Sequence, residues 1–190
     1  RDIIEVSTFR AQPHNKEVMS NGVTKDNEYG TLKEDAERRD FTCNSIYYNP
    51  ATRKVIDFYG GVKDIKEKKL SMIGDPKIRF DEDPVRILRA IRFSAKLNLK
   101  IDKNIIEAIE SKKTQLQSIP YSRLFDEIMK LFLTGHALQS IDLFNKFNLS
   151  NYYFPSFKST DPETQSFLLK GLSDTDMRIH SNKSVNPEIG

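Results

Sequence analysis

The sequence has few cysteines, no long apolar run and little net charge, and each of these properties excludes some classes of protein. Cys43 is the only cysteine, so the chain cannot form an internal disulfide, and we expect a reducing compartment such as the cytoplasm. No apolar run approaches the roughly 20 residues needed to cross a bilayer, so we expect no membrane partner. Lysine and arginine number 30 against 27 acidic residues, and a net charge of +3 is too small to indicate nucleic-acid binding by itself.

Motifs for several common chemistries are also missing. His14, His136 and His180 lack the spacing of metal ligands, which argues against a zinc site. There is no Gly-rich phosphate loop and no serine nucleophile motif. The chain starts at Arg1 rather than at methionine, so we expect its natural start to lie upstream.

The first 75 or so residues mix strand and helix signals. Thr and Glu side chains spaced as in a capping box predict the start of a short helix that ends near Arg39. β-Branched and aromatic runs predict strands, and Asn, Asp and Gly predict a polar surface loop. The capping box is 31–34, the strands are 3–9, 53–59 and 70–73, and the loop is 11–30.

From Asp83 onward the apolar spacing becomes helical. Asp83 suits an N-cap and Pro84 the first helical position. Asp102 and Ser122 are candidate caps for the next two helices. Residues 137–147 give a fourth helix, and we expect the tail after position 174 to be irregular. The fold class is therefore α+β, with a boundary near residue 81.

Arg38, Arg39 and Asp40 emerge together from the end of the first predicted helix. Guanidinium forks bind phosphate oxygens bidentately, and a nearby carboxylate can accept from a ribose hydroxyl or hold a metal ion. The three residues therefore suit one nucleotide. The alternative is structural, because arginines favour a helix C-terminus and Asp40 could cap the next turn.

Glu82, Asp83, Arg86 and Arg89 form a second polar group. Their offsets place acids and bases on one face of the first two turns of a single helix. Carboxylates and guanidiniums side by side can read the donor and acceptor edge of a base. The alternative is an N-cap with surface ion pairs, each contributing at most about 1 kcal/mol.

Glu5 lies in the first predicted strand, on the opposite face from Ile4 and Val6. It could join a cluster of metal-binding carboxylates, or it could simply be an exposed strand residue. Two-metal phosphoryl transfer needs several acidic groups that hold ions about 4 Å apart, and the sequence has no Asp-x-Asp after a Gly-rich turn.

Four stretches, taken together and in order, carry a resemblance to a known family. They are Ile4–Arg10, Glu34–Thr42, Asp57–Gly61 with Asp64, and Arg79–Phe93. Over about residues 3–155 the chain resembles the class II tRNA nucleotidyltransferase and poly(A) polymerase family, with Ile119–Phe125 matching the neck region of that family.

The resemblance implies a specific arrangement of parts. Residues 1–81 would be the C-terminal part of a mixed α/β, palm-like nucleotidyltransferase head. Residues 82–134 would be a helical neck that binds nucleobase and RNA, and 135–190 the start of an all-helical body. The main metal ligands, an Asp-x-Asp pair, would lie upstream, so we expect this chain to be inactive when isolated.

The resemblance also implies a role for each candidate residue. Arg38 and Arg39 would contact the triphosphate, Asp40 would bind ribose or act as a catalytic carboxylate, and Glu5 would lie beside the metals. The remaining assignments are Glu82, Asp83, Arg86 and Arg89 to the nucleobase, and Asp57, Gly60, Gly61 and Asp64 to a flexible joint between head and neck.

The implied reaction is attack by an RNA 3′ hydroxyl on the α-phosphate of ATP, with Mg²⁺ as cofactor and pyrophosphate as product. Residues 44–48, 82–86, 93–97, 178–180 and 185–187 resemble bacterial poly(A) polymerases more than CCA-adding enzymes. CCA addition to tRNA remains the alternative within the family. From another class, an inactive RNA-binding remnant remains open, and the upstream reading frame distinguishes it from an enzyme.

Overall fold

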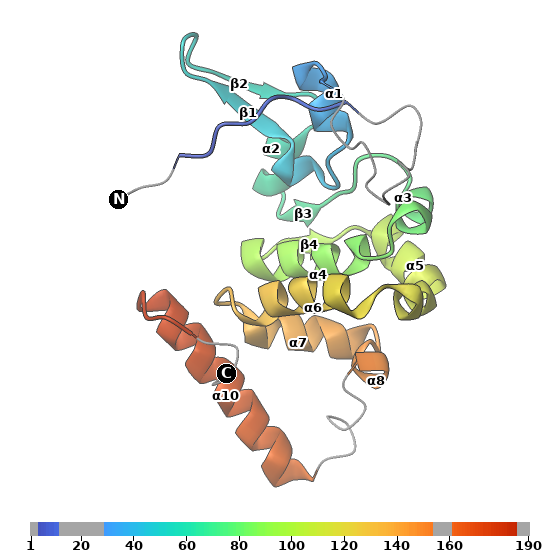
Figure 1. Ribbon diagram of the computed structural model, residues 1–190, viewed down its shortest axis with the longest axis vertical. Helices are drawn as coiled ribbons and strands as arrows, with labels where there is room; N and C mark the ends of the chain where they lie inside the picture. Colours follow the sequence, from blue (N-terminus) through green and yellow to red (C-terminus); the bar gives the residue numbers. More distant parts are fainter. Residues whose placement is uncertain (1–3, 12–28, 154–160, 186–190) are drawn as a thin grey trace, which may run out of the picture. The chain divides into compact units, whose positions relative to one another are not determined.

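The computed structural model describes residues 4–11, 29–153 and 161–185 (Figure 1). The chain divides into two compact units. The first comprises Arg1–Glu67 with Ser71–Ile73, and the second comprises Lys68–Leu70 with Gly74–Gly190. Within the described ranges, no helix combines the length and apolarity needed to cross a membrane.

The first unit begins its regular structure with helix α1 (Leu32–Glu37). The predicted capping box at Thr31 is confirmed: its Oγ1 accepts from the Glu34 amide at 3.3 Å, and Glu34 Oε2 accepts from the Thr31 amide at 2.6 Å. Two amides at the helix start are thereby satisfied. The helix ends at its C-cap, Arg38, which places the Arg-Arg-Asp motif just beyond the last turn.

A hairpin follows, formed by β1 (Ile46–Asn49) and β2 (Lys54–Asp57), which pair antiparallel. The Asn49 side chain accepts from two backbone amides of the turn, so it stabilises the reversal of the chain. The predicted strand at 53–59 is therefore confirmed, in shorter form. Around the hairpin lie the 3₁₀ turn η1 (Thr42–Asn44) and helix α2 (Gly61–Lys66), which pack together.

The predicted strand at 3–9 is wrong over its described part. Residues 4–9 form no strand, and the side chains of Ile4 and Val6 are 86% and 92% exposed. Strand-favouring residues need a neighbour for a ladder, and here the described pairing is one bridge between Arg10 and Tyr29. Residue 3 and the 12–28 part of the predicted loop lie outside the described residues.

The second unit is mainly helical. A short parallel pair, β3 (Lys69–Leu70) and β4 (Lys100–Ile101), accompanies the helices. The predicted strand at 70–73 thus ends at Leu70, and Met72 forms only an isolated bridge with Phe41 in the first unit. The helical elements are α3 (Pro76–Glu82), α4 (Arg86–Leu97), α5 (Lys103–Lys112), η2 (Lys113–Ser118), α6 (Tyr121–Phe132), α7 (Ala137–Lys146), α8 (Ser150–Tyr153) and α10 (Pro162–His180).

Helix α4 is central to the core of this unit. Its inward residues Ile87, Leu88 and Ile91 are fully buried, and it packs against both α6 and α7. Leu131 of α6 and Phe144 of α7 are buried as well. This apolar packing holds the start of α4, with its arginines, on a rigid support.

Of the three caps predicted in the second unit, two are wrong and one is confirmed. Asp102 caps α5 by accepting from the Asn104 amide at 2.9 Å. Asp83 does not begin a helix with Pro84. An earlier helix, α3, is capped by Asp75 and ends at Glu82 with Asp83 as its C-cap, and α4 begins only at Arg86. Ser122 lies inside α6, whose N-cap is the preceding proline.

The expectation of an irregular tail is also wrong, because α10 continues to His180. Its C-terminal part is fastened to α7, where Asp176 accepts from the amides of Ala137 at 2.8 Å and Leu138 at 3.2 Å. This contact between distant residues stabilises a helix whose own sequence has little periodic apolarity. Helices and small sheets together confirm the α+β fold class.

Candidate active site

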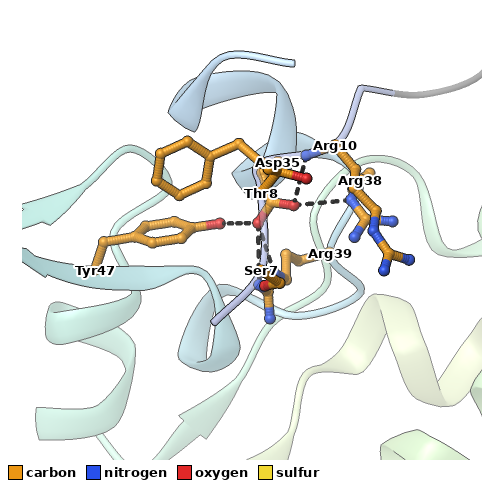
Figure 2. A pocket seen from close by; sticks show the side chains of 8 residues that line it. Ser7, Thr8, Arg10, Asp35, Arg38, Arg39 and Tyr47 are labelled. Atoms are coloured by element: carbon orange, nitrogen blue, oxygen red, sulfur yellow. Dashed lines mark hydrogen bonds and ion pairs between the residues drawn. The ribbon is translucent and has the colours of Figure 1, made fainter. Parts of the chain in front are cut away.

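A pocket of about 380 Å³ opens in the first unit, between residues 7–10, the C-terminal end of α1 and strand β1 (Figure 2). Three arginines and one aspartate line it, so its ionised groups carry a surplus of positive charge that suits an anion. The lining residues are Ser7, Thr8, Phe9, Arg10, Asp35, Arg38, Arg39 and Tyr47.

Asp35 is the common acceptor in this pocket. Its Oδ1 accepts from the Arg10 amide at 3.2 Å and from Arg38 Nε at 3.0 Å. Its Oδ2 accepts from Arg39 Nη2 at 3.0 Å and from the Tyr47 hydroxyl at 2.7 Å. Figure 2 shows these groups converging on the carboxylate from α1, β1 and the N-terminal segment.

The local sequence explains the two ion pairs. Arg38 and Arg39 follow Asp35 by three and four residues, the spacing at which side chains meet on one side of a helix. The capping box at Thr31 keeps this short helix in register. Sequence reasoning assigned no role to Asp35, although its helical spacing to both arginines was a readable signal.

The hydrogen bonds determine the charge state of the pocket. Burial by itself raises the pKa of Asp35, but hydrogen bonds from Tyr47, Arg38 and Arg39 outweigh burial and hold this pKa well below its ordinary value. Burial, together with the hydrogen bond to Asp35, raises the pKa of Tyr47. Asp35 is therefore ionised and Tyr47 neutral near pH 7.

Asp40 follows the two arginines but does not line the pocket. It is 4% exposed, and its backbone carbonyl accepts from the Ile73 amide at 2.9 Å. The next residue, Phe41, is fully buried and anchors the motif to the core of the unit. The predicted catalytic role of Asp40 stays a prediction.

Glu5 lies in the exposed N-terminal segment and does not line the pocket either. Over the described ranges, no group of three or more histidine, cysteine or acidic side chains could hold a metal ion. The metal and the part of Glu5 in binding it stay predictions.

The four residues of the predicted joint all lie within the first unit, around the start of α2. Asp57 accepts from the amides of Gly61 at 3.0 Å and Val62 at 2.9 Å, which satisfies the start of that helix. Gly60 has φ +77°, and a Cβ on Gly61 would lie 2.1 Å from the Thr42 carbonyl oxygen. Asp64 Oδ2 accepts from Thr42 Oγ1 at 2.7 Å.

The second polar group belongs to the second unit. It does not occupy one helix as predicted, because Glu82 ends α3, Asp83 is the C-cap of that helix, and Arg86 and Arg89 lie in α4. The turn between the two helices nevertheless brings Glu82 and Arg86 together. Arg86 Nη1 donates to Glu82 Oε2 at 2.6 Å.

Two arginines that sequence reasoning did not single out complete this cluster. Arg79 Nη1, on a nearly buried side chain, donates to Glu82 Oε2 at 3.1 Å. Arg123 of α6 donates to Asp83 Oδ2 at 2.5 Å. The first pairing is readable from helical spacing, whereas the second joins residues 40 positions apart.

Comparisons with known proteins show the family of this chain. Residues 1–71 match the Poly A polymerase head domain, and residues 98–160 match the probable RNA and SrmB-binding site of polymerase A. Poly(A) polymerase I of Haemophilus influenzae is 40% identical over 98% of this chain and 44% of its own length. The chain belongs to the class II tRNA nucleotidyltransferase and poly(A) polymerase family.

Other members of this nucleotidyltransferase family match over smaller shares of the chain. The CCA-adding enzyme of Streptococcus thermophilus is 36% identical over 76% of this chain and 35% of its own length. A solved tRNA nucleotidyltransferase, complexed with a primer tRNA and an incoming ATP analog, is 33% identical with a TM-score of 0.60. That match covers 65% of this chain and 37% of the solved one. The chain thus spans less than half the length of these relatives.

Proposed function

We propose that the protein containing this chain is a template-independent nucleotidyltransferase that adds AMP from ATP to RNA 3′ ends. The RNA 3′ hydroxyl forms a new bond to the α-phosphate, its proton is lost, and the bond between the α- and β-phosphates breaks to release pyrophosphate. Family membership supports the reaction class. The transfer of AMP in particular, and RNA as its acceptor, are the more specific parts of the proposal.

The pocket of the first unit carries this proposal. Arg38 and Arg39 are 34% and 41% exposed there, while Asp35, which holds them, is 4% exposed. Both guanidiniums are therefore accessible in the pocket while they are bound to a buried carboxylate. Their planar shape matches the oxygens of a phosphate. We assign Arg38 and Arg39 to the triphosphate of the incoming nucleotide and Asp40 to its ribose or to catalysis.

The cluster in the second unit suits the nucleobase. Glu82, Asp83, Arg86 and Arg89 present both acceptors and donors, which is what discrimination between base edges requires. Ion pairs with Arg86 and Arg123 restrict the orientations of the Glu82 and Asp83 carboxylates. We assign this cluster to selection of adenine.

The choice of AMP rests on the extent of similarity. The poly(A) polymerase I relative matches 98% of the chain, against 76% for the CCA-adding enzyme. A CCA-adding activity is the second candidate, and the solved tRNA nucleotidyltransferase supports it. Both candidates use the same pocket, so they differ in substrate rather than in site.

Substitution of Asp40 tests the proposed chemistry. In the intact protein we expect Asp40→Ala to lower the rate of ATP incorporation into an RNA primer by about 100-fold or more, as for loss of a charged group at a reacting centre. Glu37→Gln, at the exposed residue directly before the arginine pair, is the control and keeps the rate. Thermal melting verifies that both variants fold, and a folded Asp40→Ala variant with the unchanged rate removes Asp40 from the mechanism.

A further inference from the structure

Asp35 is arranged to orient other groups rather than to meet a ligand itself. Each of its two carboxylate oxygens accepts from two different residues of the pocket. The side chain is almost fully buried, whereas the arginines bound to it are partly exposed. The carboxylate therefore lies at the buried side of the pocket, and the guanidiniums lie nearer to solvent.

Tyr47, on strand β1, holds the Asp35 carboxylate in place. Its hydroxyl donates to Asp35 Oδ2, and its ring lies 5.8 Å from the Arg39 guanidinium carbon. On another side, the ring packs edge-on against Phe9, with centroids 6.1 Å apart. Strand β1 thus limits the movement of both Asp35 and Arg39 through a single side chain.

Two adjacent arginines need such an anchor if they are to bind one phosphate chain. Their guanidiniums repel each other, and each long side chain has many rotamers to lose on binding. A carboxylate that forms ion pairs with both arginines reduces this repulsion. It also restricts the rotamers of both side chains before the ligand binds. Preorganisation of this kind increases affinity without a new contact to the ligand.

We propose that Asp35 and Tyr47 are positioning residues for the triphosphate: Asp35 holds the guanidiniums of Arg38 and Arg39 toward the pocket, and the Tyr47 hydroxyl holds Asp35. This role rests on the proposed function, in which the same arginines bind the nucleotide. It extends that function to two residues that do not touch the substrate.

Steady-state kinetics of the intact protein with ATP and an RNA primer test the role. We expect Asp35→Asn to raise the KM for ATP about tenfold and Tyr47→Phe about threefold, because each loosens partly immobilised side chains. The KM for RNA changes less than twofold. Tyr48→Phe, an exposed neighbour on the same strand, is the matched control and leaves both constants unchanged.

Tyr47→Phe keeps the ring and loses only the hydroxyl, so it remains informative if Asp35→Asn fails to fold. A double-mutant cycle then separates positioning from general stability. Arg39→Ala should raise the KM for ATP severalfold less in a Tyr47→Phe background than in the parent protein. Equal effects in both backgrounds would overturn the positioning role of Tyr47.

The two proposals fail differently. If Arg38→Ala and Arg39→Ala leave the KM for ATP unchanged, the assignment of these arginines to the triphosphate fails, and the positioning role fails with it. If the arginine variants raise the KM while folded Asp35→Asn and Tyr47→Phe do not, only the positioning role is overturned. A raised KM in all four variants, with the non-additive cycle, supports both.

Discussion

The Asp83 carboxylate, one of the four groups assigned to the nucleobase, is bound by Arg123 of α6. A carboxylate paired with a guanidinium has a fixed orientation and less charge to offer a ligand. Asp83 Oδ1 also accepts from the Val85 amide at 3.2 Å, so both of its oxygens are engaged. We therefore expect the proposed base selectivity to depend on Arg123 as well.

We expect Arg123→Ala in the intact protein to reduce the preference for ATP over CTP about threefold to tenfold, because loss of an ordinary hydrogen bond costs about 0.5–1.5 kcal/mol and the Arg123 side chain is 55% exposed. The measurement is the ratio of kcat/KM for the two nucleotides. Lys103→Ala, which removes an exposed cation from a surface ion pair of α5, is the control and leaves the ratio unchanged. An unchanged ratio in Arg123→Ala as well would separate Arg123 from nucleotide selection.

At the scale of elements, a side chain of α10 caps the N-terminus of α7. Asp176, 7% exposed, accepts from the first two amides of α7, and His136 and His180 lie beside it with ring centroids 5.6 Å apart. Amides at a helix start have no partner within the helix, and a negative charge is favourable there. The contact thus stabilises both helices.

We expect Asp176→Ala to lower the free energy of unfolding by about 1–3 kcal/mol, because it leaves two amides of α7 without their acceptor. Urea denaturation followed by circular dichroism measures the change. Asp174→Ala, an exposed site on the same helix, should alter stability by less than about 0.5 kcal/mol. Equal stability of the two variants would contradict a capping role for Asp176.

Local chemistry made some elements predictable. The capping box at Thr31 and the cap at Asp102 each involve residues two or three positions apart, and the structure confirms both. The pattern around Asp83 was ambiguous, since an aspartate before a proline suits a helix start. The Asp75-Pro76 pair fits the same rule and begins α3 instead.

Contacts between distant residues were not predictable in the same way. The hydroxyl of Tyr47 reaches Asp35 across 12 positions, and Asp176 reaches Ala137 across 39. Such pairs depend on how the elements pack, which no local pattern specifies. The sequence therefore indicated Arg38 and Arg39, and the helical spacing of Asp35 to both was readable, whereas the contact of Tyr47 with Asp35 became visible only in the fold.

At the scale of the whole molecule, the proposed nucleotide contacts are divided between the two units. The residues assigned to the triphosphate lie in the first unit, and those assigned to the nucleobase lie in the second. On these proposed assignments, we expect binding of the nucleotide and selection of its base to be separable by mutation. We expect variants of Arg39 to raise the KM for ATP and CTP alike, and variants of Arg86 to change their ratio.

The most direct test of the proposed function is the product formed by the intact protein on two RNAs. A generic RNA primer and a tRNA that lacks its terminal CCA are incubated with Mg²⁺ and either ATP or CTP, and product lengths are read on a gel. Our account predicts long tails on the generic primer with ATP alone. Extension of the tRNA by only a few nucleotides, with a requirement for CTP, would contradict adenylate addition and establish the CCA-adding alternative, whereas no extension of either RNA would contradict the enzymatic proposal.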